Sequence, residues 1–150
     1  MLTCLIIHLK LKKKINFFKK NSLDLLISSR YLKKSKIINW PFSRKILSKI
    51  SNILARLLLG IPITDYTNGY RIYSKRAVNL ITRHCGKIGD GFIILSEIIL
   101  ILNNKGMKIS EIDTIFINRI RGSSSVNLRL IVQSLIGLSK LYLMKKFNKL

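Results

Sequence analysis

The sequence is poor in acidic residues, histidine and cysteine. It holds six Asp and Glu residues against 28 Lys and Arg, with only two His and two Cys. Cys4 and Cys85 lack a C-x-x-C spacing, and His8 and His84 are equally isolated. Disulfide frameworks and zinc centres need clustered ligands of these types. The sequence therefore excludes both as organising features and favours a reducing compartment.

Long hydrophobic runs are also missing. A membrane-spanning helix needs roughly 18–20 consecutive apolar residues. The two best candidates fall short, because Glu97 interrupts Phe92–Leu102 and because Leu130–Ser139 is too short. At the N-terminus the lysines follow the apolar run MLTCLIIHL, whereas a secretory signal places its charges first. We expect no membrane span and no signal peptide, and therefore a cytoplasmic protein.

Several common catalytic signatures are absent. The chain has no Gly-rich loop of the P-loop or dinucleotide-binding type. Its two isolated histidines form no Ser/His/Asp or Cys/His arrangement with a nucleophile. Enzymes built on these motifs are therefore excluded.

The positive charge is the most prominent feature that the sequence does have. The formal net charge is +22, and a field of that sign attracts nucleic acid, anionic lipid head groups or ligands that carry phosphate. Solvated lysines in a Lys-rich composition give the same charge without a partner. Aromatic residues make up only 8% of the chain and no RNA-binding signature occurs, which argues against nucleic acid.

The pattern of apolar residues predicts one α/β domain with a sheet core. At 150 residues the chain is long enough to bury such a core. Short apolar runs predict strands, and apolar residues three and four apart predict helices. We expect strands at Leu2–Leu9, Leu23–Ser28, Tyr70–Tyr73 and Ile109–Asn118, helices at Phe42–Leu59, Lys75–Arg83, Phe92–Asn104 and Val126–Lys146, helix or loop at Lys10–Asn21, and loops at Tyr31–Asn39 and Arg119–Asn127.

The helix expected at Phe42–Leu59 has the clearest pattern. Its stripe of apolar residues consists of Ile46, Leu47, Ile50, Ile53, Leu54, Leu57 and Leu58. Basic residues lie off the stripe, and Gly60 followed by Pro62 ends the helix. Two interpretations stay open. The helix can lie on an anionic membrane surface, or its stripe can face the core while its back is solvated.

Arginine recurs beside small polar residues at the expected ends of elements. The stretches are Ser29-Arg30, Ser43-Arg44, Asn118-Arg119 and Arg121-Gly122-Ser123. Arginine presents a fork of donors that matches phosphate oxygens, and hydroxyl and loop N–H groups can supplement it. The pattern predicts a phosphate site at an edge of the sheet. The alternative is an arginine that is simply solvated at a strand end.

Two acidic residues stand out by their surroundings. Asp65 lies in the stretch DYTNGYR, where Thr67 and Asn68 favour a turn and Gly69 permits a positive φ. Glu97 is the single acid in an apolar helix, so we expect it to be buried or to face a pocket.

Five stretches together resemble one known family. They are LDLLISSRY (23–31), NWPFSRKILSKISNILARLLLG (39–60), ITDYTNGYRIYSKRAV (63–78), DGFIILSEIILILNNKGMKISEIDTIFINR (90–119) and RGSSSVN (121–127). In order and approximate spacing they resemble the C-terminal half of family 2 glycosyltransferases, in the polyprenyl-phosphate (dolichyl-phosphate) mannosyltransferase-like branch. The resemblance implies an α/β fold of the GT-A type, with a mixed sheet and flanking helices.

The resemblance also implies an activity and its partners. Such enzymes transfer a hexose, mannose or glucose, from a nucleotide sugar to polyprenyl or dolichyl phosphate, typically with GDP-mannose or UDP-glucose and with Mg²⁺ or Mn²⁺. The acceptor is a membrane lipid, which places the protein peripherally at the membrane surface. Because the acceptor is already an anion, catalysis then rests on positioning and charge stabilisation.

The resemblance further implies roles for individual residues. Arg30 and Arg44 match arginines associated with the lipid phosphate, and Ser48 lies one helical turn past Arg44 on the same side. On the donor side, Arg119 and Ser124 in the Gly/Ser loop match positions near the nucleotide diphosphate. The sugar or acceptor pocket is implied to include Asp65, Gly69 and Glu97.

The sequence departs from the family pattern at its N-terminus. By spacing, the metal-binding Asp-x-Asp motif falls near Met1–Leu5, where no acid occurs, so no metal ligand is assigned. We interpret the chain as one partial domain with a divergent segment at 1–22, a family-like region at 23–127 and a basic C-terminal helix at 128–150. We therefore expect a missing N-terminal half and little transferase activity from this chain alone. The alternative is a non-catalytic basic module that binds a membrane surface or nucleic acid.

Overall fold

The computed structural model describes residues 2–86, 88, 92–118 and 128–147, and gives side-chain surroundings for all of these except 2–10, 92 and 128–131. Three strands form the main sheet, in the order β3-β1-β4. The central strand β1 (Leu25–Ser29) runs parallel to β4 (Ile109–Asp113) and antiparallel to β3 (Arg71–Tyr73). All five residues of β1 are buried, so elements cover both faces of the sheet.

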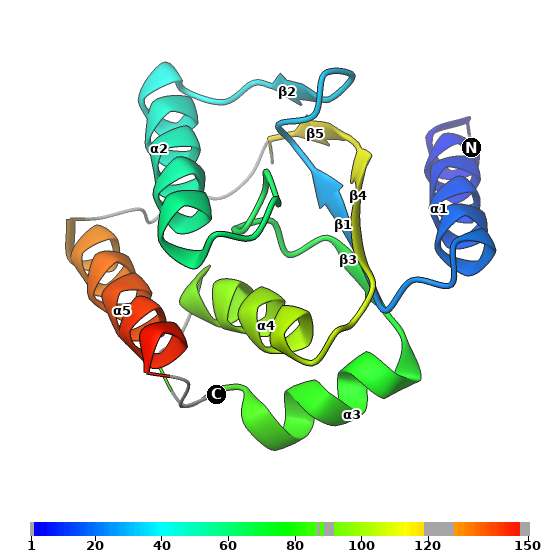
Figure 1. Ribbon diagram of the computed structural model, residues 1–150. Helices are drawn as coiled ribbons and strands as arrows, with labels where there is room; N and C mark the ends of the chain where they lie inside the picture. The colour runs from blue at the N-terminus through cyan, green and yellow to red at the C-terminus, as the bar shows by residue number, and fades with distance from the viewer. Residues whose placement is uncertain (1, 87, 89–91, 119–127, 148–150) are drawn as a thin grey trace.

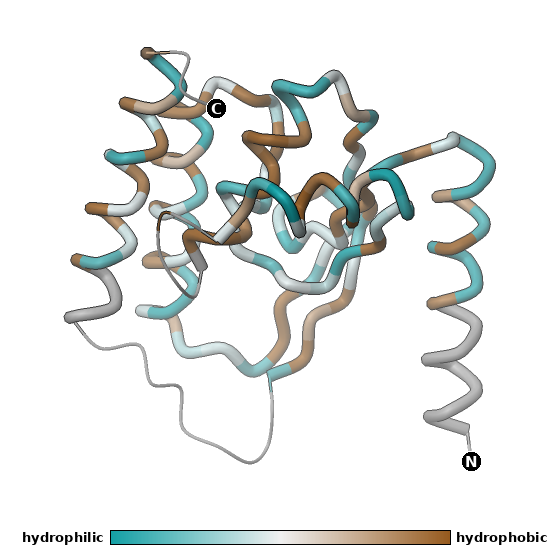
Figure 2. Tube along the Cα trace, turned by 90° about the horizontal axis from the view of Figure 1, so that it is seen from below, coloured by the Kyte–Doolittle hydropathy of each residue, from teal (hydrophilic) through white to brown (hydrophobic). Residues whose placement is uncertain are grey.

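Helices lie on the two sides of this sheet. Figure 1 shows α1 (Leu2–Lys20) on one side, and α2 (Phe42–Leu59), α4 (Phe92–Asn104) and α5 (Leu128–Lys146) on the other. Seen from below, α1 and α5 stand at opposite sides of the molecule (Figure 2). The fold is therefore a mixed α/β arrangement with a mixed sheet and flanking helices.

The main core lies between the sheet and the second group of helices. Leu25 and Ile27 of β1 pack there with residues of α2, α4 and α5, among them Leu59, Ile99 and Leu141. The helix α3 (Lys75–His84) contributes buried Ala77, and Ser74 caps it by accepting a hydrogen bond from the Ala77 N–H at 3.1 Å. This core holds the C-terminal part of α2 against the sheet.

The opposite face of the sheet contacts α1 through a buried lysine. Lys14 Nζ donates to Ser28 Oγ at 2.8 Å and to Thr114 Oγ1 at 3.1 Å, and it lies 4.2 Å from the centroid of the Tyr70 ring. The ammonium group therefore joins three segments of the chain beneath the end of β1.

A second, two-stranded sheet extends the molecule beyond β1 and β4. Its strands β2 (Lys36–Ile38) and β5 (Ile115–Ile117) pair in parallel. The ring of Trp40, just after β2, lies 5.2 Å from the Phe116 ring in an edge-to-face arrangement. This small sheet places an aromatic pair beside the N-terminus of α2.

The sequence predictions for α2 and α4 are confirmed, and those for α3, β1 and β3 are correct within two residues. The strand predicted at Leu2–Leu9 is wrong, because this segment is the first part of α1. A short apolar run favours a strand, but the apolar residues at positions 2, 5, 6 and 9 have the three- and four-residue spacing of a helix.

Two further predictions need correction. The expected loop at Tyr31–Asn39 contains β2, and the strand expected at Ile109–Asn118 divides into β4 and β5 around Thr114. Both differences have one cause. The strands β2 and β5 pair with each other although they are distant in the sequence, and local patterns do not predict such pairing. The predicted loop at Arg119–Asn127 and the start of the last helix at Val126 lie outside the described residues.

Candidate functional site

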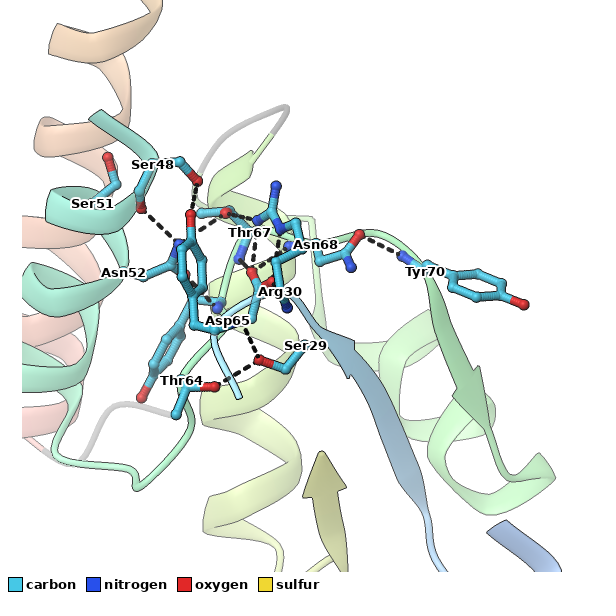
Figure 3. A network of polar contacts seen from close by, with 12 residues as sticks. Ser29, Arg30, Ser48, Ser51, Asn52, Thr64, Asp65, Thr67, Asn68 and Tyr70 are labelled. Carbon is cyan, nitrogen blue, oxygen red and sulfur yellow. Dashed lines mark hydrogen bonds and ion pairs between the residues drawn. The ribbon is translucent and has the colours of Figure 1, made fainter. Parts of the chain in front are cut away.

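The centre of the candidate site is a buried ion pair at the end of β1. Arg30 follows β1 directly, and its Nε and Nη2 each donate to a different carboxylate oxygen of Asp65 at 2.7 Å. The backbone N–H of Arg30 donates to Asp65 as well, at 2.9 Å. Asp65 has no exposed surface and Arg30 is 8% exposed. This fork-to-fork geometry fixes the guanidinium group in one orientation (Figure 3).

The same carboxylate organises the turn that carries it. Asp65 Oδ1 accepts from the N–H groups of Asn68 at 3.0 Å and Thr67 at 3.3 Å. The Asn68 side-chain amide donates to the backbone oxygen of Ser28, and Asn68 Oδ1 accepts from the Tyr70 N–H at 3.2 Å. Side-chain hydrogen bonds therefore shape this turn.

The role expected for Gly69 in the turn is wrong. Gly69 does not have a positive φ, and a Cβ added there meets nothing within 4 Å. The backbone conformation of the turn does not require glycine. Its assignment to the sugar pocket stays a prediction.

Glu111 of β4, which the sequence analysis did not single out, holds the segment before the turn. Its carboxylate accepts from the Thr64 N–H and hydroxyl, each at 2.8 Å, and from the Asp65 N–H at 3.0 Å. Thr64 also contacts Ser29 Oγ at 2.7 Å. Its position on a strand that also carries Ser110 and Asp113 does not distinguish it, and its partners lie more than 40 residues away.

A second residue that sequence reasoning missed, Arg71, anchors the other side of the turn. Its guanidinium donates to three backbone oxygens, those of Tyr66, Asn68 and Leu95, at 2.7 to 2.9 Å. Burial lowers the pKa of Arg71. The turn is thus tied to β1, β4 and α4 at once.

The inner face of α2 contributes two polar side chains. Ser48 Oγ accepts from the Tyr31 hydroxyl at 2.6 Å, and burial raises the pKa of that hydroxyl. Asn52 Oδ1 accepts from the Tyr66 N–H at 2.6 Å, while its Nδ2 donates to the Ser48 backbone oxygen and to Thr67 Oγ1. These bonds connect the helix to both the arginine and the turn (Figure 3).

Trp40 connects the two arginines that the sequence assigned to a phosphate. The Arg44 guanidinium carbon lies 4.3 Å from the centroid of the Trp40 ring, and that of Arg30 lies 5.2 Å from it. Arg44 also donates to Asn118 Oδ1 at 3.3 Å. The rings of Tyr31 and Phe116 lie within 6 Å of Arg30. The structure therefore brings Arg30, Arg44 and Ser48 into one cluster with aromatic rings.

The remaining predicted residues lie elsewhere. Glu97 of α4 is buried, as expected, and accepts from the Gly86 N–H at 3.0 Å. Burial and the charge of Glu97 raise the pKa of the neighbouring Cys85 thiol to about 11. Arg119 and Ser124 lie outside the described residues.

The acidic residues of the site do not fit a divalent cation. Among the residues that the structure describes, no group of three or more His, Cys, Asp or Glu side chains could hold a metal ion. Asp65 and Glu111 are already bound to Arg30 and to the backbone of the turn. No step of the chemistry is therefore assigned to a metal held by these residues.

The outer surface of α2 and α5 is apolar. On α2 the exposed side chains are Phe42, Ile46, Ile50, Ile53 and Leu57, and on α5 they are Val132, Leu135, Ile136, Tyr142 and Leu143. We call these ten residues the outer apolar surface. The two helices contact each other. Within the described ranges, no helix has the length and hydropathy needed to cross a membrane.

Comparison with known proteins gives a consistent result. The polyprenol monophosphomannose synthase of Mycolicibacterium smegmatis is 33% identical over 104 residues, which are 69% of this chain and 39% of the relative. The undecaprenyl-phosphate mannosyltransferase of Micrococcus luteus is 30% identical over 120 residues, which are 78% of this chain and 48% of the relative. This chain is similar to polyprenyl-phosphate glycosyltransferases over most of its length.

The similarity has two limits. No family model matches the chain. The aligned region spans less than half the length of either relative. For this chain, the activity, the acceptor and the sugar donor are therefore matters of proposal.

Proposed function

We propose that this chain is the acceptor-binding part of a GT-A glycosyltransferase that transfers a hexose from a nucleotide sugar to a polyprenyl phosphate. The observation that carries the proposal is the placement of Arg30 and Arg44 against one Trp40 ring, with Ser48 close by. Two guanidinium groups at one place provide the charge and the donors that a phosphate monoester needs. The names of both relatives support the same acceptor class.

The buried ion pair suggests how such a site works. Asp65 occupies Nε and Nη2 of Arg30, so the guanidinium cannot rotate freely and its position is set before any ligand binds. An acceptor phosphate is already an anion and needs no strong base to attack the sugar carbon. Fixing its oxygens in place and balancing its charge is then the main task of these residues.

The remaining assignments complete the proposal. Arg119 and Ser124 are proposed to bind the donor diphosphate, and Asp65, Gly69 and Glu97 to border the sugar or acceptor pocket. Mannose from GDP-mannose or glucose from UDP-glucose is the proposed donor group. Any Mg²⁺ or Mn²⁺ would need ligands other than Asp65 and Glu111. We propose that these ligands come from the nucleotide-binding half of a complete enzyme.

We further propose that the outer apolar surface rests on the membrane that holds the acceptor. Phe42 and Leu57 are 77% and 74% exposed, and Lys45, Lys49 and Arg56 lie on the same helix. Exposed apolar side chains with basic neighbours are typical of helices that bind the surface of an anionic membrane. A non-catalytic basic module is not favoured, because the two relatives are named as a synthase and a mannosyltransferase.

A chimera tests the proposed activity. Residues 23–127 replace the corresponding region of the Mycolicibacterium smegmatis synthase, and transfer of labelled mannose or glucose to undecaprenyl phosphate is measured with each donor supplied separately. We expect transfer with one of the two donors, and little transfer from the 150-residue chain alone. A chimera that folds but transfers neither sugar contradicts the proposal.

The chimera also tests the role of the arginine cluster. Arg44→Gln should reduce transfer by about tenfold or more, since hydrogen bonds between charged groups are lost. Lys75→Gln on α3 removes the same charge from an exposed position and should leave transfer nearly unchanged. Equal effects of the two substitutions would show that only the net charge matters.

A further inference from the structure

Trp40 is buried at the centre of the arginine cluster. It is 7% exposed, and its ring faces the guanidinium groups of Arg44 and Arg30 at centroid distances of 4.3 and 5.2 Å. The ring of Phe116 lies against it at 5.2 Å with an interplanar angle of 71°. One aromatic side chain thus holds both positive groups through cation–π contacts.

The indole N–H of this residue lacks an acceptor. Among the described residues, Trp40 Nε1 is the only buried side-chain nitrogen or oxygen without a hydrogen-bond partner. Buried donors in proteins are almost always paired, so an orphan donor calls for an explanation. The indole N–H can only donate, and the two guanidinium groups beside the ring favour an anionic acceptor.

The helix that begins after Trp40 offers donors of the same kind. Pro41 occupies the N-cap of α2 and cannot provide a side-chain acceptor for the first N–H groups of the helix. No acidic residue lies in the first turn of α2. The positive end of the helix dipole therefore adds to the charge of the arginines at this place.

We propose that Trp40 is a phosphate-binding residue, whose Nε1–H donates to an oxygen of the acceptor's phosphate monoester while its ring positions Arg30 and Arg44. This inference rests on the proposed function, which supplies the acceptor class. Three oxygens and a charge near −2 let a monoester accept from several donors at once. Arg30 Nη1, which has no hydrogen-bond partner among the described residues, and the Arg44 guanidinium are the other donors.

The chain contains a single tryptophan, which makes the test direct. A nitrogen–proton correlation spectrum of the labelled protein shows one indole resonance. Dodecyl phosphate is titrated in neutral maltoside micelles, with dodecanol and inorganic phosphate as parallel titrations. We expect the indole proton to move downfield with dodecyl phosphate and not with dodecanol. A shift of equal size at equal concentration of inorganic phosphate assigns the site to free phosphate in place of the lipid and overturns the proposal.

Trp40→Phe isolates the contribution of the N–H group. It keeps an aromatic ring beneath the arginines and should weaken binding of dodecyl phosphate by about tenfold, the effect expected for a hydrogen bond to a charged group. Tyr70→Phe also removes one polar atom from an exposed aromatic ring, outside the arginine cluster and the outer apolar surface, and should have no effect. Circular dichroism of both variants checks that they fold, and the titration of the unaltered chain does not depend on either of them.

The outcomes separate this inference from the proposed function. If the unaltered chain and Trp40→Phe bind dodecyl phosphate equally and the indole resonance does not move, while Arg44→Gln loses binding, the phosphate site stands and the role of Trp40 is refuted. If the unaltered chain binds no dodecyl phosphate, the proposed acceptor site itself is refuted. A downfield shift together with the loss in Trp40→Phe supports both.

Discussion

The two faces of α2 differ in their polar groups and in their exposure. The inner face carries Ser48 and Asn52, whose side chains bond to Tyr31, Tyr66 and the turn around Asp65. The outer face carries five exposed apolar residues. A helix on a water-exposed surface normally shows the reverse arrangement. The comparison teaches that Ser48 and Asn52 connect α2 to the arginine cluster and the turn, whereas the exposed apolar residues of its outer face have no such role inside the molecule and are the ones proposed to contact a membrane.

The strongest test of the inner region is Asp65→Asn. Loss of the carboxylate charge leaves the buried Arg30 guanidinium without its partner, and removing one member of a buried pair costs roughly 3–5 kcal/mol. Urea denaturation of both chains measures the change in the free energy of unfolding. Asp113→Asn, at an exposed position of β4, is the matched control and should change little. Equal losses in the two variants would contradict the structural role of the ion pair.

The outer region is tested by the double substitution Ile50→Glu and Leu57→Glu. Burial of each apolar side chain in lipid contributes on the order of 1.5–3 kcal/mol, so affinity for anionic vesicles should fall by about a hundredfold or more. Because both residues are exposed, the free energy of unfolding should change by less than about 0.5 kcal/mol. Val78→Glu on α3 introduces the same side chain at another exposed apolar position and should reduce vesicle binding far less. Similar reductions would refute a specific role of α2.

A smaller effect is expected for Asn52→Ala on the inner face. The substitution leaves the buried Tyr66 N–H without an acceptor, which should cost about 1–3 kcal/mol. Ser51→Ala, one residue earlier, removes only a local bond to the Leu47 backbone oxygen. Thermal unfolding of the two variants compares them directly. If Ser51→Ala destabilises the protein as much as Asn52→Ala, the link between α2 and the turn is not important for stability.

The smallest predicted effect concerns pH and lies far from both faces. The hydrogen bond from Arg76 holds the pKa of Asp24 below its usual value. The stabilisation by this group is therefore present above about pH 4 and is lost as the pH falls through the pKa of the folded state. Because Arg76 is exposed, its ion pair with Asp24 should contribute less than about 1 kcal/mol, and the difference in unfolding free energy between the unaltered chain and Asp24→Asn should shrink under acid. A difference that grows below pH 4 would contradict this sign.

The sequence predicted those elements whose signals are local. Helix α2 ends at Gly60, which has a φ of 64° and donates to the Arg56 backbone oxygen, and Ser74 caps α3. Both signals were readable because the residues that bond lie within four positions of each other. The apolar stripe of α2 predicted a helix but not which of its residues face the core. Its residues divide between the core, which receives Leu54 and Leu58, and the exposed outer face.

The candidate site shows what a sequence cannot reveal by itself. Arg30 and Asp65 were each singled out, but for separate roles, Arg30 for the acceptor phosphate and Asp65 for the sugar or acceptor pocket. Their 35-residue separation gives no sign that they form one ion pair. Glu111 and Trp40 were missed as functional candidates for the same reason. Their importance comes from partners that only the sheet order and the position of α2 bring close.

The central claim is that the arginine cluster recognises a lipid-linked phosphate at a membrane surface. Its most direct test is the affinity of the chain for phosphatidylglycerol vesicles with and without undecaprenyl phosphate, at equal total negative charge and elevated salt. We expect binding about tenfold tighter with undecaprenyl phosphate, and Arg44→Gln should lose this increase while keeping affinity for phosphatidylglycerol. Equal binding to the two kinds of vesicle would contradict the claim, because it would leave charge alone as the cause of binding.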